Sequence, residues 1–287
     1  MKYFVADFKI NCTGELFDIA RDLVISAAGD AQFEAFEENE GGVLAYIQKD
    51  LFDKVALDSA LESVDMPGVD IHYIIEDVED KNWNSNWEDN GFDPINIDGK
   101  CIVYDAKHTD RYALEKETLN ILIEARQAFG TGTHQTTRLV IRELMRSNMK
   151  EKSLLDCGCG TGILSIVASK LGAKHVVGFD IDEWSVDNAN HNAKLNDIDN
   201  MDVLLGNAEI LNGVDERFDV VVANINRNII ISDLAQYTKR MTDKAVLILS
   251  GFYQHDIDII QTEALKYDLQ LTGCNTEDDW ACIVLTK

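Results

Sequence analysis

The chain has 287 residues, of which 46% are hydrophobic and 27% are charged, so it is long enough for one large globular domain or two smaller ones. Its 2 prolines and 18 scattered glycines exclude a collagen-like or disordered chain. Acidic residues outnumber basic ones 51 to 26, which gives a net charge of −25. Such a chain repels polyanions, and we therefore expect no direct binding to nucleic acid or to an anionic membrane.

Compartment and redox state are predicted from what the sequence lacks. Residues 1–7 have no apolar core of a signal peptide, and the charge-free run 157–169 is too short to span a bilayer. The six cysteines form no C-x-x-C pair, and neither a second thiol pair nor a histidine cluster accompanies Cys157 and Cys159. We expect a cytoplasmic protein that binds no metal.

Charge is distributed unevenly along the chain. Residues 1–100 hold 23 acidic and 7 basic residues, a net charge of −16, whereas the remaining 187 residues have a net charge of −9. This asymmetry favours two domains with different roles. We place a small domain at 1–78, a linker helix at 79–95 and a larger domain at 96–287.

The first domain shows strand and helix patterns in regular succession. Apolar alternation and helical spacing predict strands at 3–10, 32–37, 43–48 and 69–78, and helices at 15–28 and 51–64. The order β-α-β-β-α-β is typical of the ferredoxin-like α+β fold. Since many unrelated proteins use this fold, it indicates only a recognition or scaffold module.

The linker is polar and contains three aromatic residues. Trp83, Trp87 and Phe92 have helical spacing, which predicts a short helix anchored by aromatic side chains. These rings either pack on a neighbouring domain or face a substrate.

The second domain alternates strands and helices. The predicted strands are 95–104, 119–124, 154–156, 176–180, 203–206, 218–223, 245–250 and 282–286, and the predicted helices are 138–145, 163–171, 184–195, 228–241 and 255–266. Such alternation predicts an α/β fold with a parallel, doubly wound, Rossmann-like sheet.

The strongest local motif follows the strand at 154–156. Gly158, Gly160 and Gly162 lie between this strand and a helix, where glycines let a ligand approach the main chain. Asp180 ends the next strand, 22 residues after Gly158, and a carboxylate there can accept hydrogen bonds from both hydroxyls of a ribose. We expect Asp182 to cap the following helix instead.

Two further strand ends carry polar residues. Asn207 and Ala208 follow the third strand and either border an adenine ring or form an ordinary loop. Asn224 ends the fourth strand, at the edge where doubly wound sheets bind ligands. Its amide oxygen can hold a substrate amine, unless the residue only forms a turn.

Together these motifs resemble a class I S-adenosylmethionine-dependent methyltransferase. Residues 128–137, Ala-Phe-Gly-Thr-Gly-Thr-His-Gln-Thr-Thr, are more specific and are similar to the ribosomal protein L11 methyltransferase family of the PrmA type. The Trp83/Trp87 linker, the ferredoxin-like first domain and Trp280 also match the layout of that family, so the resemblance covers essentially the whole chain.

The resemblance implies an S-adenosyl-L-methionine-dependent enzyme that methylates lysine side chains, either alone or together with the N-terminal amine, of the large-subunit ribosomal protein L11. It implies that residues 1–78 recognise this protein and that the linker repositions them. Asn224 is expected to position the amine. The residues expected to bind the methyl donor are Thr137, Gly158, Gly160, Gly162, Asp180, Asn207, Ala208 and Asn224.

The sequence departs from the family pattern at three places. Residues 125–127 are Ala-Arg-Gln where the family has Pro-Gly, and Gln135 replaces the proline after His134. Residues 225–227 are Ile-Asn-Arg where the family has Ile-Leu-Ala, beside the expected acceptor pocket. His134 either belongs to the cofactor loop or packs in the core.

Other functions share part of this pattern. A nicotinamide-dependent oxidoreductase would use Asp180 too but has the glycine spacing G-x-G-x-x-G. An N-methyltransferase acting on nucleic acid would need a basic surface, whereas one acting on another protein would need no change in these motifs. A non-catalytic binding module would not need an intact donor site.

Overall fold

We describe a computed structural model of the chain over residues 3–12, 14–39, 41–62, 64, 66–77, 91–111, 114–125 and 132–287. Its contacts divide the chain into two compact units, Met1–Asn82 and Trp83–Lys287. Most of the predicted linker, including Trp83 and Trp87, lies outside the described residues. Each unit has its own apolar core.

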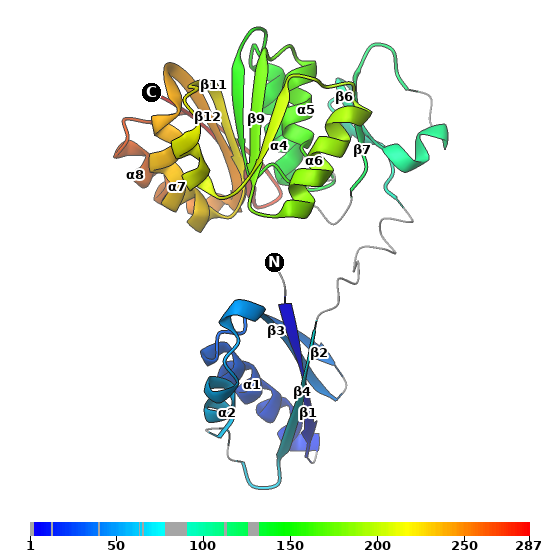
Figure 1. Cartoon of the computed structure of the whole chain (residues 1–287), viewed down its shortest axis with the longest axis vertical. Helices are drawn as coiled ribbons and strands as arrows, with labels where there is room; N and C mark the ends of the chain where they lie inside the picture. The colour runs from blue at the N-terminus through cyan, green and yellow to red at the C-terminus, as the bar shows by residue number, and fades with distance from the viewer. Residues whose placement is uncertain are drawn as a thin grey trace. The chain divides into compact units, whose positions relative to one another are not determined.

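The N-terminal unit is a four-stranded antiparallel sheet with two helices on one face (Figure 1). Its elements are β1 (Tyr3–Asn11), α1 (Gly14–Asp30), β2 (Ala35–Asn39), β3 (Gly42–Gln48), α2 (Lys54–Glu62) and β4 (Asp70–Asp77). The spatial order β2-β3-β1-β4 places the first and last strands side by side. The predicted β-α-β-β-α-β order is confirmed.

The second helix is shorter than predicted. Residues 49–51 form a separate 3-10 turn, and α2 begins only at Lys54. The side chain of Asp53 accepts hydrogen bonds from the main-chain N–H groups of Val55 and Ala56 at 2.8 and 3.2 Å. This cap satisfies two of the free N–H groups at the helix end and therefore fixes where the helix starts.

The C-terminal unit is built on a seven-stranded sheet with the order β10-β9-β8-β11-β12-β14-β13. The strands are β8 (Ser153–Cys157), β9 (His175–Asp180), β10 (Met201–Leu205), β11 (Phe218–Asn224), β12 (Met241–Tyr253), β13 (Gln270–Glu277) and β14 (Trp280–Thr286). The helices are α4 (Gln135–Arg146), α5 (Ile163–Lys170), α6 (Glu183–Leu195), α7 (Arg227–Lys239) and α8 (Ile257–Leu265). Helices α4, α5 and α6 lie on one side of the sheet and α7 and α8 on the other, which confirms the doubly wound fold (Figure 1).

The far edge of this sheet corrects the prediction of an all-parallel sheet. Strand β13 was not predicted, because every second residue along it is exposed and its sequence is largely polar. It pairs with β14 in an antiparallel hairpin, and β14 is also antiparallel to β12. Only two residues separate β13 from β14, and so short a connection can join antiparallel strands but not parallel ones.

A small third sheet has the order β5-β6-β7, with β5 (Ile95–Ile97), β6 (Cys101–Asp105) and β7 (Leu119–Ile123). The prediction of one strand over 95–104 is wrong. Asp98 and Gly99 have φ of 54° and 67°, and this left-handed turn reverses the chain into the β5–β6 hairpin. Strand β7 runs parallel to β6.

His175, at the start of β9, links this strand to β10 and to the loop before β11. His175 lies 2.7 Å from the carboxylate of Glu216 and 3.0 Å from that of Asp202. Burial alone would lower the pKa of His175, but the hydrogen bonds and charges of the two carboxylates outweigh it, so the pKa is raised above 6.5. The folded state therefore favours the protonated imidazole.

We expect His175→Gln to destabilise the protein most at acidic pH. Because the pKa is raised on folding, the stabilisation is complete below about 6.5 and is lost as the pH rises through the folded-state value. The difference in melting temperature between the wild type and the variant, measured from pH 5.5 to pH 9, should shrink as the pH increases. A difference that does not change with pH would contradict this account.

Candidate active site

The ends of four parallel strands bring the predicted motifs to one edge of the sheet. Residues 158–162 follow β8 and form the glycine turn. The N–H groups of Gly158 and Cys159 donate to the Phe179 carbonyl at 2.9 and 3.0 Å, and that of Gly160 donates to the Asp180 carboxylate at 2.9 Å. The turn is thereby tied to the end of β9, where ligands of such sheets bind.

The glycine turn needs glycine for both conformation and space. Gly158, Gly160 and Gly162 have φ of 74°, 52° and 78°, a left-handed conformation that other residues adopt at a cost. A Cβ atom on Gly158 would lie 2.5 Å from the Ile225 side chain, and one on Gly162 would lie 3.0 Å from Ala189. Gly158 is partly exposed, and residues 159–162 are buried.

Asp180 and Asp182 have different environments. Asp180 is partly exposed beside the glycine turn, and its second oxygen accepts from the Asp182 N–H at 3.1 Å. Asp182 caps α6 by accepting from the N–H and hydroxyl of Ser185 at 3.2 and 3.1 Å. The expected capping role of Asp182 is confirmed, and contact of Asp180 with a ribose stays a prediction.

Three large apolar side chains at this edge were missed by sequence reasoning. Ile181, Trp184 and Leu205 are 53%, 53% and 51% exposed, and Leu205 pairs in register with Asp180. Exposed apolar groups beside a polar strand end suit the face of an aromatic base. The sequence signal that could have revealed this apolar surface is Ile181, which directly follows Asp180 at the end of β9.

Asn207 and Ala208 follow β10 at the same edge. The side-chain oxygen of Asn207 accepts from the Glu209 N–H at 3.0 Å and caps the short helix η3 (Ala208–Gly213). Ala208 is buried. The Asn207 oxygen therefore has the local role expected of an ordinary loop residue. Contact of Asn207 and Ala208 with an adenine ring stays a prediction.

Asn224 and Thr137, 87 positions apart, are brought together. The Asn224 amide nitrogen donates to the Thr137 hydroxyl at 3.4 Å. The Asn224 amide oxygen is buried and has no hydrogen-bond partner among the described residues. Leaving a buried acceptor unpaired costs about 1–3 kcal/mol. This oxygen is therefore prepared to accept a hydrogen bond from a group that enters the site.

The segment that departs from the family pattern has a structural role here. The N–H of Ile225 donates to the Ser250 carbonyl at 3.2 Å, and Asn226 caps α7. Arg227 donates to the buried Asp256 at 2.5 Å. Burial raises the pKa of Asp256, but the hydrogen bonds from Arg227 and the Tyr253 N–H, together with the nearby charges of Arg227 and His255, outweigh it and the pKa is lowered. Asn226 and Arg227 thus secure the loop that follows Asn224.

An aromatic cluster lies at the start of α4 and the ends of β12 and β14. The ring of Trp280 is 4.7 Å from that of His134 and 4.2 Å from that of Tyr253 between centroids. His134 also caps α4 by accepting from the Thr136 N–H. Burial and the nearby charge of Arg138 lower the pKa of His134, so its imidazole is neutral at pH 7. Sequence reasoning did not identify Tyr253.

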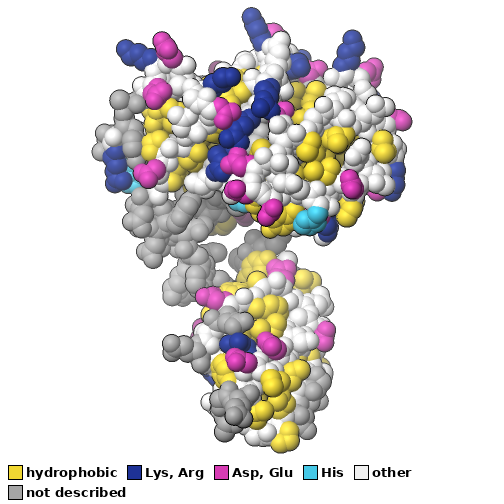
Figure 2. Space-filling model, turned by 180° about the vertical axis from the view of Figure 1, so that it is seen from behind, with side chains coloured by type: hydrophobic (Ala, Val, Ile, Leu, Met, Phe, Trp, Pro, Cys, Tyr) yellow, Lys and Arg dark blue, Asp and Glu magenta, His cyan; other side chains and the backbone are white. Residues whose placement is uncertain are grey.

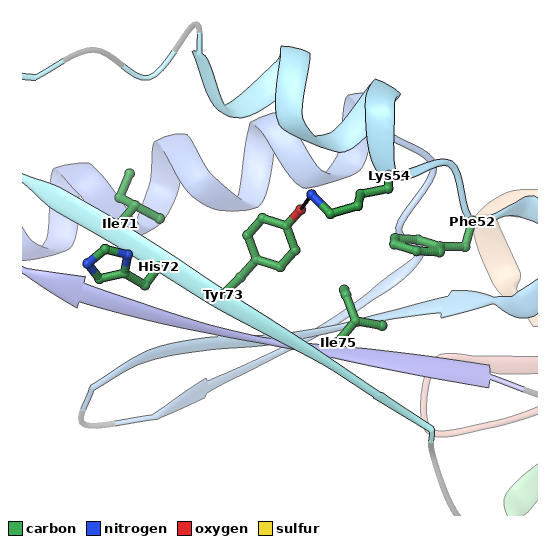
Figure 3. Close-up of a pocket in the computed structure, with 6 residues that line it drawn as sticks. All are labelled: Phe52, Lys54, Ile71, His72, Tyr73 and Ile75. Carbon is green, nitrogen blue, oxygen red and sulfur yellow. Dashed lines mark hydrogen bonds between the residues drawn. The ribbon is translucent and has the colours of Figure 1, made fainter.

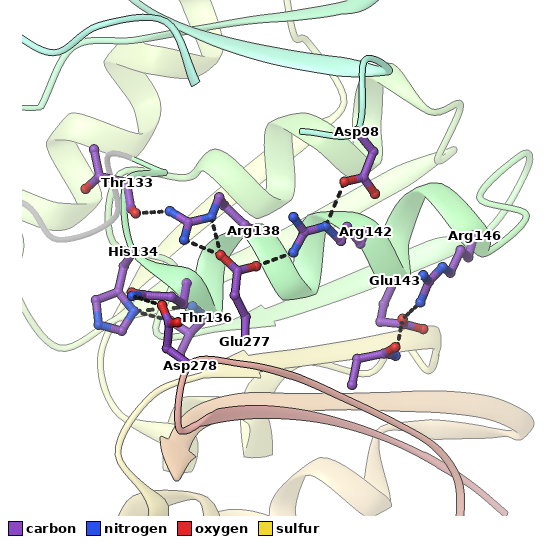
Figure 4. Close-up of polar contacts among 12 residues, drawn as sticks. Asp98, Thr133, His134, Thr136, Arg138, Arg142, Glu143, Arg146, Glu277 and Asp278 are labelled. Carbon is purple, nitrogen blue, oxygen red and sulfur yellow. Dashed lines mark hydrogen bonds and ion pairs between the residues drawn. The ribbon is translucent and has the colours of Figure 1, made fainter. Parts of the chain in front are cut away.

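An ion-pair network fixes α4 against the β13–β14 hairpin (Figure 4). Glu277 accepts from both Arg138 and Arg142, and Arg142 also donates to Asp98 at 3.1 Å. Burial raises the pKa of Glu277, but hydrogen bonds from the two arginines outweigh it and the pKa is lowered. Arg138 further donates to the Thr133 carbonyl. The network therefore holds the first turn of α4, which carries Thr137.

The two cysteines of the glycine turn are buried thiols. Burial raises the pKa of both Cys157 and Cys159, so they stay protonated at neutral pH and are poor metal ligands. Within the described part of the chain there is no group of three or more His, Cys, Asp or Glu side chains that could hold a metal ion. The same residues include no helix long and apolar enough to cross a membrane.

The N-terminal unit has a shallow cavity of about 480 Å³ beside β4 (Figure 3). It is lined by Phe52, Lys54, Ile71, His72, Tyr73 and Ile75. The Lys54 ammonium already donates to Asp58 at 2.6 Å and to the Tyr73 hydroxyl at 3.1 Å. The lining mixes apolar side chains with Lys54, His72 and Tyr73, and the polar groups of Lys54 and Tyr73 are already hydrogen-bonded to each other.

Fold and strand-end motifs together define an S-adenosylmethionine-dependent methyltransferase of class I. The family model for "Ribosomal protein L11 methyltransferase (PrmA)" matches residues 19–287. Proteins with the name ribosomal protein L11 methyltransferase from Phocaeicola vulgatus and Bacteroides thetaiotaomicron are 42% and 41% identical to this chain. These matches cover 99% and 100% of this chain and 98% and 100% of the relatives. The chain belongs to the ribosomal protein L11 methyltransferase (PrmA) family.

A solved structure supports the same conclusion. The ribosomal protein L11 methylase from Lactobacillus delbrueckii subsp. bulgaricus has a TM-score of 0.62 and 28% sequence identity to this chain. The match covers 68% of this chain and 98% of that one.

Proposed function

We propose that this chain is a cytoplasmic enzyme that transfers methyl groups from S-adenosylmethionine to lysine side chains of ribosomal protein L11, either alone or together with its N-terminal amine. The observation that carries the proposal is the buried, unpaired amide oxygen of Asn224 at the strand-end edge. Relatives that carry this name over their whole length support the choice of acceptor.

The strand-end residues fit the methyl donor. The glycine turn 158–162 carries no side chain at three positions, which lets a ligand approach its main chain, and Asp180 offers carboxylate oxygens to ribose hydroxyls. Ile181 offers an apolar face to adenine at the end of β9, and Asn207 and Ala208 follow the neighbouring strand β10. The chemistry supplied by the donor is a methyl group on a positively charged sulfur, which is a good leaving group.

The residues of the chain then act on the acceptor amine. A lysine amine has an ordinary pKa of about 10.4, and its neutral form is scarce at pH 7. Burial in the site lowers that pKa and raises the neutral fraction. The Asn224 oxygen can accept a hydrogen bond from one amine N–H and so orient the lone pair of the nitrogen toward the methyl group. This contribution comes from alignment of the reacting atoms and needs no general base.

The aromatic cluster of His134, Tyr253 and Trp280 would form a wall of the acceptor site. Ring faces attract ammonium groups and their methylated forms. Because the His134 imidazole is neutral, it adds no positive charge that would repel the incoming amine. The wall also excludes water from the reacting nitrogen.

Residues 1–78 are proposed to recognise the protein substrate, with residues 79–95 as the linker and 96–287 as the catalytic domain. The first segment contains 17 acidic and 5 basic residues, a net charge of −12. Figure 2 shows acidic side chains among exposed apolar ones on one face of this unit. Ribosomal proteins are generally basic, and complementary charge speeds encounter and orients docking.

The test compares the full chain with a chain that starts at Trp83, the boundary between the two compact units. Both are given labelled S-adenosylmethionine and purified L11, and the products are analysed by mass spectrometry. We expect methylated L11 only with the full chain, and its apparent KM for L11 should rise with salt, which screens charge beyond about 8 Å at physiological ionic strength.

The shortened chain retains every strand-end residue and should still bind the donor. Equal methylation of L11 by both chains would show that residues 1–78 are not the recognition module. Label in another protein or in nucleic acid, and none in L11, would contradict the proposed acceptor.

A further inference from the structure

Helix α6 buries a row of three asparagines. Asn188, Asn192 and Asn196 are spaced four residues apart and therefore lie along one side of the helix. They are 2%, 0% and 4% exposed. Burying an amide is unfavourable unless its groups are hydrogen-bonded, so a buried row of this kind needs partners on a neighbouring element.

The partners of these asparagines lie along the open edge of β7. Strand β7 is the last strand of its sheet, with β6 on its other side. Asn196 accepts from the Leu122 N–H at 2.9 Å and donates to the Leu122 carbonyl at 2.6 Å. Two residues on, the Glu124 N–H donates to Asn192 at 3.0 Å and its carbonyl accepts from Asn188 at 2.8 Å. The helix side chains thus replace a neighbouring strand.

Asn192 makes one contact that the other two do not. Its amide nitrogen donates to the carbonyl of Thr161 at 2.9 Å, and Thr161 belongs to the glycine turn 158–162. The next residue, Gly162, packs so closely on Ala189 of α6 that a Cβ atom would lie 3.0 Å away. Asn192 therefore uses its oxygen for β7 and its nitrogen for the glycine turn.

We propose that Asn192 is a positioning residue for the methyl donor, which rests on the proposed function. It holds the main chain of the glycine turn at Thr161, and so fixes the conformation of the turn, in which Gly158, Gly160 and Gly162 have positive φ. The Asn196 side chain bonds to Leu122 of β7 and to the main-chain carbonyl of Asn192 at 2.8 Å, and none of these bonds involves the glycine turn.

The experiment compares Asn192→Asp, Asn192→Ala and Asn196→Ala by calorimetric titration with S-adenosylhomocysteine and by thermal unfolding. Asn192→Asp keeps the volume and the acceptor for the Glu124 N–H but places an oxygen against the Thr161 carbonyl. We expect both Asn192 variants to raise the Kd by about tenfold, the effect of one lost buried hydrogen bond. Asn196→Ala should lower the melting temperature and change the Kd by less than twofold.

Steady-state kinetics separate positioning from general destabilisation. In the Asn192 variants the KM for S-adenosylmethionine should rise, while kcat at saturating donor and the KM for the protein substrate stay within about twofold of the wild type. Wild-type Kd values in both Asn192 variants, or an equal loss of affinity in Asn196→Ala, would overturn this inference but leave the proposed function standing. A wild-type chain that binds no S-adenosylhomocysteine would overturn the proposed function and this inference with it.

Discussion

Replacing Asn224 by alanine is expected to lower kcat for methyl transfer on the order of a hundredfold. The acceptor amine loses the group that aligns it, and a small misplacement of a reacting group has an effect of this size. Its effect on stability should be small. The amide oxygen has no hydrogen-bond partner among the described residues, and its amide nitrogen makes one long bond to Thr137 at 3.4 Å. Removing an unpaired buried acceptor relieves a cost instead of adding one. Single-turnover kinetics and thermal unfolding of the variant measure the two effects.

Asn226→Ala is the matched control for this measurement. Asn226 is the same residue type two positions later, and its side chain caps α7 by accepting from the Asn228 N–H at 2.8 Å. Loss of such a cap typically reduces stability by about 1 kcal/mol, so this variant should melt earlier and retain most of its turnover. Near-normal turnover in Asn224→Ala would show that another group holds the amine.

Gly160→Val should weaken binding of S-adenosylmethionine by more than about a hundredfold. The residue has φ of 52°, and its N–H donates to Asp180 within the glycine turn. A non-glycine residue in this conformation costs roughly 1–2 kcal/mol, and the branched side chain would also project from main chain that the donor must approach. Isothermal titration calorimetry with the donor measures the loss.

Gly99→Val controls for the strain of the substitution. Gly99 has a similar φ of 67°, and a Cβ atom there would meet nothing within 4 Å. It lies in the β5–β6 turn, away from the strand-end motifs. Both variants should lose some thermal stability, but only Gly160→Val should lose the donor. Unchanged donor affinity in folded Gly160→Val would remove the glycine turn from the proposed binding site.

Local patterns in the sequence were sufficient for most of the element order and for the strand-end motifs, but not for β13 or for the β5–β6 hairpin. A buried parallel strand is recognised in the sequence as a short apolar run. Its carboxyl end is recognised by the glycine or polar residue found there, as at Gly158, Asp180 and Asn224. Each of these signals is contained in a window of about ten residues. The family resemblance added the acceptor, because residues 128–137 are specific to that family in a way that the glycine spacing is not.

The tertiary structure decided which distant groups meet. Thr137 and Asn224 lie 87 positions apart, and the Tyr253–Trp280 stack depends on β14 pairing with β12. Sequence periodicity reports which face of an element is buried but not which element covers it. For the same reason the spacing of the α6 asparagines does not reveal that they pair with the edge of β7. Hydrogen-bond pairing of buried polar groups is a property of the assembled neighbours, and only the folded chain determines it.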